Sequence, residues 1–171
     1  MQDNALYIDL SSITKAEGAV LDVKKTYPKE AFYEVERTLP LASDVSLCGS
    51  ITNLSGNLFL KGTISFCMSF MCDRCLDDFT QEFSLEIDEV ITKENSDFEA
   101  DEYISYTANK VLLVEAIFKL IYQLTLEKHI CKDDCKGLCS KCGCNLNLKD
   151  CDCTDDEIDP RLEKLKDFFK N

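Results

Sequence analysis

Residues 58–70 read LFLKGTISFCMSF, and this pattern decides what kind of fold the chain can adopt. Apolar side chains recur at every second position, while the positions between them are mostly polar. The apolar positions that share one parity are Leu58, Leu60, Ile64, Phe66, Met68 and Phe70. Because successive side chains of a strand point to opposite faces, a period of two predicts a β-strand with one buried face.

The same period extends over residues 45–90, for example where apolar positions of 83–87 alternate with polar ones. Ser55, Gly56 and Asn57 are typical of a turn between strands. We therefore expect an antiparallel meander. Gly62, inside the longest strand, predicts a bulge or bend that would let the sheet curl towards a barrel.

Flanking segments carry weaker signals. Residues 6–10 and 32–37 are short strand candidates. Residues 86–102 contain eight acids and one lysine, which predicts a solvated loop, although a docking face for a basic partner is the alternative.

Two helices are expected. The first runs over about residues 109–126, with Asn109 as its N-cap and apolar positions almost all round, so it is predicted to be a buried core helix. The second begins at Asp159 and Pro160 and would pack back through apolar residues at helical spacing. These residues are Leu162, Leu165 and Phe169.

The predicted fold class is thus α+β: a partly barrel-like antiparallel meander with a core helix, a small zinc-knuckle module and a short C-terminal helix. The expected boundaries are 1–130 for the β-rich scaffold, 131–153 for the cysteine-rich module and 154–171 for the C-terminal helix.

The formal net charge of -13 constrains the partners of this 171-residue chain. A strongly acidic protein repels phosphate backbones, so direct nucleic-acid contact is expected to be weak or indirect, whereas basic proteins are attracted. The N-terminal sequence MQDNALYIDL does not resemble a signal peptide, and the apolar segment 111–126 is too short to span a bilayer. A cytoplasmic location without membrane contact is the expectation.

Cysteine spacing gives the main indication of function. The stretch CKDDCKGLCSKCGCNLNLKDCDC, residues 131–153, holds seven of the eleven cysteines. Such clustering is typical of thiolate ligands for a soft metal, with zinc as the default. The pairs with ligand spacing are Cys72 and Cys75 (CxxC), Cys131 and Cys135 (CxxxC), Cys139 and Cys142 (CxxC, followed by Gly143), and Cys151 and Cys153 (CxC).

Eight thiols suffice for two tetrahedral sites, so two zinc ions are expected. One set would combine Cys139 and Cys142 with Cys151 and Cys153. The other would join Cys72 and Cys75, at the tip of the long hairpin, to Cys131 and Cys135. Two alternatives remain open for this long-range set: isolated pairs, or a cluster of residues 131, 135, 139 and 142 that leaves the hairpin metal-free.

The remaining candidates are given lesser roles. Cys48 and Cys67 are expected to be buried as small hydrophobic residues. Cys144 is either a spare thiol or one that exchanges with a ligand. His129 has no partner that would make it a catalytic base, so we expect a loop residue near the zinc and no enzymatic activity.

The segments CDRCL (72–76), CKDDCKGLCSKCGCNLN (131–147) and DPRLEKL (159–165), in this order, resemble the YceD family. Its members are known as large ribosomal RNA subunit accumulation proteins of bacteria and plastids, and no enzymatic activity is established for them. Some relatives keep the CxRC hairpin and lack the later knuckle, which by resemblance supports two separable sites.

The resemblance implies a protein needed for accumulation of large-subunit ribosomal RNA. The charge and the absence of catalytic groups lead us to expect a non-catalytic ribosome-biogenesis factor that binds a basic ribosomal protein or a large-subunit precursor. The alternative of another class is a redox-sensing zinc thiol protein of the oxidation-switched chaperone type. An iron–sulfur carrier fits the spacing less well. Direct RNA binding by a zinc ribbon conflicts with the charge, since lysines and aspartates of residues 131–153 balance four to four.

Overall fold

A computed structural model of the chain describes residues 6–33, 39–93 and 103–153. These residues form two compact units. The first consists of the described residues up to 70 together with 78–128, and the second consists of 71–77 together with 129–153.

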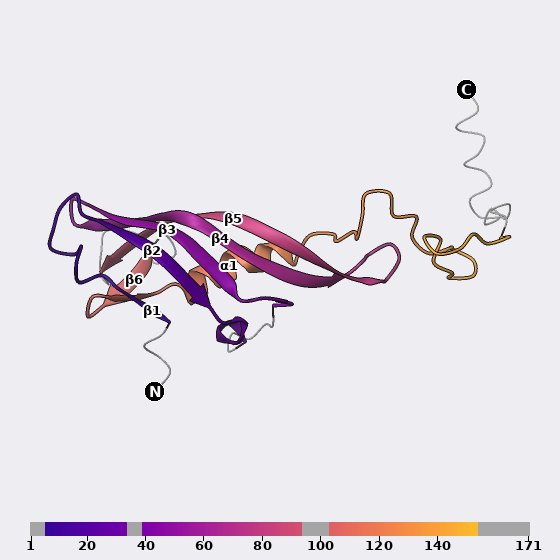
Figure 1. The fold of residues 1–171 in the computed structure, drawn as a ribbon, viewed down its shortest axis with the longest axis horizontal. Helices are drawn as coiled ribbons and strands as arrows, with labels where there is room; N and C mark the ends of the chain where they lie inside the picture. Colours follow the sequence, from indigo (N-terminus) through magenta and orange to yellow (C-terminus); the bar gives the residue numbers. More distant parts are fainter. Residues whose placement is uncertain (1–5, 34–38, 94–102, 154–171) are drawn as a thin grey trace, which may run out of the picture. The chain divides into compact units, whose positions relative to one another are not determined.

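A sheet of seven strands, counted over the described residues, makes up most of the first unit (Figure 1). Its spatial order is β1-β7-β6-β5-β4-β3-β2. The strands are β1 (Tyr7–Asp9), β2 (Val20–Tyr27), β3 (Val45–Leu54), β4 (Asn57–Met71), β5 (Asp78–Lys93), β6 (Ile104–Thr107) and β7 (Lys110–Leu112). The helical elements are η2 (Lys29–Phe32) and α1 (Val114–Leu124).

The sequence predicted a purely antiparallel sheet, but the observed sheet is mixed. Strands β2, β3 and β4 pair antiparallel in sequence order, as do β6 and β7. Strand β5, however, pairs parallel with β6, where Ile91 lies opposite Ile104. Strand β1 joins the far edge by pairing with β7, with Tyr7 opposite Leu112. The first strand of the chain therefore completes the sheet next to one of the last.

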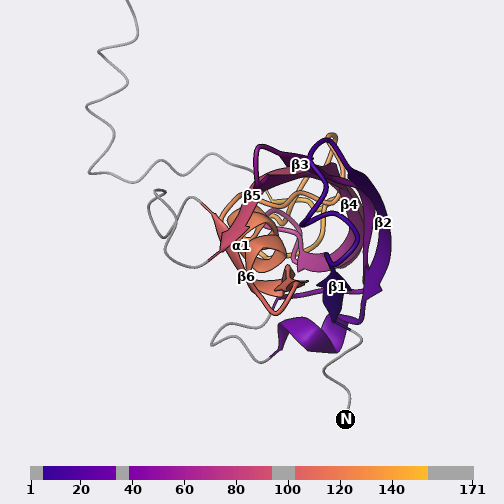
Figure 2. The ribbon, with the colours of Figure 1, turned by 90° about the vertical axis from the view of Figure 1, so that its left-hand side faces the viewer.

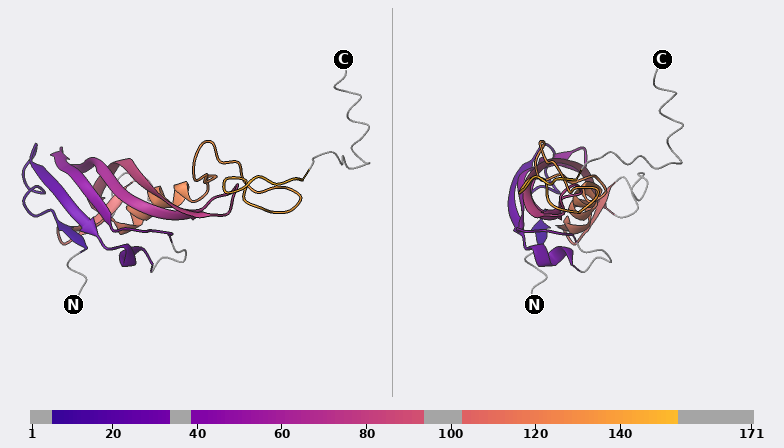
Figure 3. Two further views of the ribbon diagram at one scale, coloured as in Figure 1. Left: turned by 45° about the vertical axis from the view of Figure 1, so that its right-hand side comes forward. Right: turned by 90° about the vertical axis from the view of Figure 1, so that its right-hand side faces the viewer.

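The sheet curls into a half-barrel around helix α1, which lies on its concave side (Figures 2 and 3). The edge strands β1 and β2 lie close enough for a direct side-chain contact. The Lys25 ammonium donates a hydrogen bond of 2.6 Å to the backbone oxygen of Tyr7. Desolvation lowers the pKa of Lys25. One lysine side chain thus spans a seam where no ladder between β1 and β2 is formed.

The period of two predicted the central strand and its buried face correctly. Strand β4 covers residues 57–71, and all six apolar residues of the shared parity are buried, from Leu58 to Phe70. The turn before it is also confirmed, since Ser55 and Gly56 both have positive φ, 53° and 90°. Strand β3 adds Val45, Leu47 and Ile51 to the same core.

Gly62 has a different role from the predicted bulge. The register of β3 and β4 continues unbroken past it, and Gly62 lies directly opposite Gly49. A Cβ on Gly62 would lie 2.6 Å from the Cys48 backbone oxygen, and a Cβ on Gly49 would collide with the backbone of Lys61. Two facing glycines therefore let the strands approach more closely than side chains would permit.

Helix α1 is shorter than predicted. Asn109 does not cap it, because this residue, with φ of 56°, lies in the turn between β6 and β7. The helix contributes four buried side chains to the core, while Glu115, Lys119 and Gln123 are exposed along one face. Among the described residues, none of the helices combines the length and apolar character needed to cross a bilayer.

Several other predictions were wrong in detail. Strand β2 was missed, and Phe32 lies in η2 and not in a strand. The first part of the expected acidic loop, residues 86–93, belongs to β5, whereas 94–102 and the predicted C-terminal helix lie outside the described residues. Cys48 is exposed and Cys67 half-buried, so neither is the core residue that was expected.

The facing glycines generate a test of the fold. We expect Gly62→Ala to lower the free energy of unfolding by about 1–3 kcal/mol, because the added methyl group must push the β3 backbone away. Chemical denaturation monitored by circular dichroism measures this change. Ser65→Ala, at an exposed position of the same strand, is the matched control and should change stability little. Equal stability of both variants would contradict the close approach.

Candidate metal centres

The segment CDRCLD, residues 72–77, folds into a tight turn that brings its two cysteines together. The Cys72 N–H donates to the Asp77 carbonyl at 2.9 Å, and the Leu76 N–H donates to the Cys72 carbonyl at 2.9 Å. Leu76 closes the turn in the left-handed region, with φ of 61°. A leucine pays about 1–2 kcal/mol for this conformation, so the surroundings must hold the turn.

The segment CSKCGC, residues 139–144, repeats this turn. The Cys139 N–H donates to the Cys144 carbonyl at 2.8 Å, and the Gly143 N–H donates to the Cys139 carbonyl at 2.9 Å. Gly143, with φ of 70°, occupies the place of Leu76, where glycine adopts the left-handed conformation without steric cost. We call residues 72–77 the first knuckle and residues 139–144 the second knuckle.

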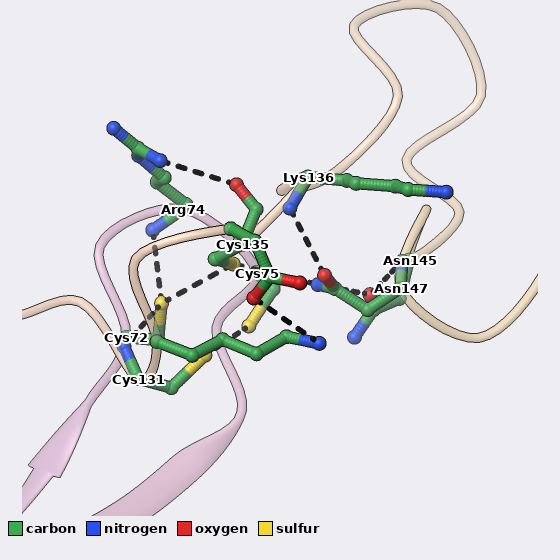
Figure 4. Close-up of polar contacts among 10 residues, drawn as sticks. Cys72, Arg74, Cys75, Cys131, Cys135, Lys136, Asn145 and Asn147 are labelled. Carbon is green, nitrogen blue, oxygen red and sulfur yellow. Dashed lines mark hydrogen bonds and ion pairs between the residues drawn. The ribbon is translucent and has the colours of Figure 1, made fainter.

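The first knuckle brings Cys72 and Cys75 together with Cys131 and Cys135, as predicted for the long-range set. Their four Sγ atoms lie within 4.8 Å of one another, and all but Cys131 are buried. Sγ of Cys72 is 3.9 Å from that of Cys135, and Sγ of Cys75 is 3.7 Å from that of Cys131. We call these four residues the first cluster (Figure 4).

These distances match tetrahedral zinc. Zinc–sulfur bonds of about 2.3 Å place two thiolates of a tetrahedral site about 3.8 Å apart. The two Sγ–Sγ separations, 3.7 and 3.9 Å, bracket this value. An all-sulfur tetrahedron suits zinc better than magnesium or calcium, which prefer oxygen ligands. The residues present therefore fit a zinc ion.

Hydrogen bonds to Sγ of Cys72 favour its thiolate form. The N–H groups of Arg74 and Cys131 donate to Sγ of Cys72 at 3.5 and 3.4 Å. Burial opposes ionisation of Cys72, but backbone N–H groups such as those of Cys131 and Arg74 outweigh it and lower its pKa to about 6. At neutral pH this sulfur is ready to bind a metal cation.

Asparagines of the NLN sequence, residues 145–147, support the first cluster. The Asn147 amide donates to Sγ of Cys135 at 3.4 Å, while its oxygen accepts from the Lys136 N–H at 2.9 Å (Figure 4). Asn145 donates to the Asp77 carboxylate at 2.7 Å. Sequence reasoning missed both asparagines, although their place between two cysteine pairs was a usable signal.

Three further hydrogen bonds link the first knuckle to His129 and Cys135. Asp73 accepts from the His129 N–H through its carboxylate at 2.8 Å and donates its own N–H to the His129 carbonyl at 2.9 Å. The guanidinium of Arg74 donates to the Cys135 carbonyl at 3.2 Å. His129 is thus a loop residue whose backbone holds the knuckle.

Five thiols gather at the second knuckle. Sγ atoms of Cys139, Cys142, Cys144 and Cys151 lie within 4.8 Å of one another, and the thiol of Cys153 contacts those of Cys142 and Cys139. We call these five residues the second cluster. The structure thus brings Cys139, Cys142 and Cys151 together as predicted, and it adds Cys144 to the group of four in the place expected for Cys153.

The second cluster is more open than the first. Cys142 and Cys153 are exposed and the other three thiols are half-buried. Backbone N–H groups of Cys142 and Lys141 lower the pKa of Cys139 to about 6, just as at the first knuckle. Contact with the Cys142 thiol raises the pKa of Cys144, and likewise that of Cys153, to about 12.

A cleft in the first unit is the other candidate site. It has a volume of about 490 Å³ and lies between α1 and the strands β5 and β6. Its charged lining residues are Glu89, Glu115 and Lys119, which sum to one negative charge. Burial raises the pKa of Glu89, and the positive charge of Lys119 partly offsets this rise. The cleft therefore favours a cationic side chain over an anion.

Comparison with known proteins gives one match to a family model and one relative that covers most of the chain. A model of the family described as large ribosomal RNA subunit accumulation protein YceD matches residues 60–169. The uncharacterized protein ML1660 of Mycobacterium leprae (strain TN) is 22% identical over 94% of this chain and 76% of its own length.

A second relative matches over a short segment. Large ribosomal RNA subunit accumulation protein YCED homolog 1, chloroplastic, of Arabidopsis thaliana is 57% identical over 30 residues, which are 18% of this chain and 9% of that protein. No solved structure matches the chain significantly.

The asparagine that supports Cys135 generates a test of the first cluster. We expect Asn147→Ala to weaken zinc binding by roughly 10- to 100-fold, the usual cost of losing a group that supports a metal ligand. Competition with a chromophoric chelator measures the affinity. Leu148→Ala alters the neighbouring exposed side chain and should leave the affinity unchanged. Equal affinities for both variants would exclude a role for Asn147.

Proposed function

This chain belongs to the YceD family of large ribosomal RNA subunit accumulation proteins, and we propose that it is a ribosome-biogenesis factor that supports accumulation of large-subunit ribosomal RNA. The observation that carries the proposal is that the family match over residues 60–169 includes both knuckles. The name of the Arabidopsis relative agrees with this role.

The proposed factor holds two zinc ions. Cys72, Cys75, Cys131 and Cys135 would bind one, and Cys139, Cys142 and Cys151 with a fourth thiol, Cys153 in our sequence-based assignment, would bind the other. Structural zinc contributes on the order of 10 kcal/mol to the folding of small modules with little core. Zinc would therefore order the module 131–153. In sequence, this module follows the proposed scaffold 1–130 and precedes the proposed C-terminal helix within 154–171.

The proposed partner is a basic ribosomal protein or a large-subunit precursor. A net charge of -13 attracts basic proteins and repels bare phosphate backbones, so contact with RNA would be indirect. The cleft lined by Glu89 and Glu115 offers one place for a lysine or arginine side chain. Binding of this kind weakens with rising ionic strength.

A non-catalytic role suits the chemistry of the described residues. The lowered pKa values of Cys72 and Cys139 belong to thiols that are grouped with at least three others each, as metal ligands require. We propose a cytoplasmic location; the name of the Arabidopsis relative shows that a relative functions in a plastid.

The second candidate function is redox sensing, and the open second cluster favours it. Exposed Cys142 and Cys153 could each join another thiol in a disulfide when peroxide takes up the two electrons and is reduced to water. The oxidised pair could no longer hold zinc. Peroxide-induced zinc release accompanied by holdase activity would support this function over ribosome assembly.

The proposed function is tested in two steps. Native mass spectrometry should find two zinc ions on the full chain and one on Cys72→Ser, while Cys48→Ser, at an exposed thiol outside both clusters, should keep two. Deletion of the protein should lower the level of large-subunit ribosomal RNA, and the tagged protein should co-sediment with precursor particles at low salt.

Unchanged RNA levels together with absent co-sedimentation would refute the ribosomal role. An unchanged zinc count in Cys72→Ser would instead reject the first cluster as a metal site.

A further inference from the structure

The second cluster holds more thiols than one zinc ion uses. A structural zinc site takes four ligands, whereas Cys139, Cys142, Cys144, Cys151 and Cys153 are five. The first cluster has four, with no further thiol in contact among the described residues. The fifth thiol therefore distinguishes the second cluster from the first.

The two candidates for the fourth ligand are Cys144 and Cys153. Cys144 lies within 4.8 Å of Cys139, Cys142 and Cys151, and the Cys153 thiol reaches Cys142 and Cys139. Each candidate belongs to a CxC pair, Cys142 with Cys144 and Cys151 with Cys153. Each could therefore complete the same set of three ligands.

The backbone leaves the Cys144 side chain free for this role. At the first knuckle the equivalent residue is Asp77, whose carbonyl closes the turn and whose side chain accepts a bond from Asn145. Cys144 closes the second turn through the same carbonyl, and its sulfur is added to the cluster. The fold of the turn does not require that sulfur.

Solvent access supports exchange at the second cluster. Cys142 and Cys153 are exposed, while three of the four thiols of the first cluster are buried. A competing ligand can approach a zinc ion bound among exposed thiolates more readily than one that is enclosed.

We propose that the second cluster is an exchange site, in which Cys144 and Cys153 alternate as the fourth zinc ligand and zinc can pass to a competing thiolate or chelator. In each exchange one zinc–sulfur bond forms as the entering thiol gives up its proton, and one breaks as the leaving thiolate takes up a proton. Coordination number and charge are unchanged. The proposal rests on the zinc binding proposed above.

The test uses the zinc-loaded full chain and an excess of the chromophoric chelator 4-(2-pyridylazo)resorcinol. We expect two release phases, a fast one for the second cluster and a slow one for the first. Cys144→Ser and Cys153→Ser should each keep two zinc ions by native mass spectrometry. Each should also slow the fast phase, because the thiol that takes the place of the leaving ligand is then absent.

The double variant, Cys144→Ser with Cys153→Ser, should bind one zinc ion, because only three thiols of the second cluster remain. Cys48→Ser should leave both phases unchanged. If either single variant loses a zinc ion, that cysteine is an obligatory ligand and the proposal is overturned. Release of both ions in one phase overturns it as well, whereas a wild-type chain without zinc refutes the metal sites themselves.

Discussion

The second unit depends on one constraint, the tetrahedral spacing of four sulfurs contributed by two distant parts of the sequence. Residues 71–77 and 129–153 form one compact unit, and the first cluster lies where they meet. Neither part has an apolar core of its own among the described residues, since the buried cluster of the protein lies in the first unit. The Arg74 N–H and the Asn147 amide donate hydrogen bonds to sulfurs of the first cluster, and the Asp73 carboxylate accepts one from the His129 N–H. In the proposed zinc-bound form the metal would replace a core.

The parts of the fold that could be predicted are those with a strong local pattern. Strand β4 alternates over its length because one face is buried, and its turn contains Gly56. Strand β2 could not be found in this way. Two adjacent lysines obscure its period. One of them, Lys25, donates a hydrogen bond to the Tyr7 carbonyl on β1. The parallel pairing of β5 with β6 is likewise a long-range property that no local pattern encodes.

Cysteine spacing predicted the candidate centres well where the chain itself closes a turn. Both knuckles follow from a CxxC sequence, and the pairing of Cys72 and Cys75 with Cys131 and Cys135 was predicted because each pair lacked two ligands. The place of Cys144 was not predictable to the same degree. It depends on the fold of the second knuckle, in which the Cys144 carbonyl accepts the Cys139 N–H and the Cys144 sulfur also joins the cluster. Asn147 was missed because its partner Cys135 is distant in sequence.

The order of the strands bears on how the protein emerges during synthesis. Tyr7 pairs with Leu112, so β1 has no partner until β7, the last of the described strands in sequence, has left the ribosome. Non-local pairing of this kind slows folding and prolongs exposure of an unpaired edge. Cys72 and Cys75 remain without their partner thiols even longer, because Cys131 and Cys135 follow the sheet in the chain. A nascent chain can therefore complete the first cluster only after Cys135 has been synthesised.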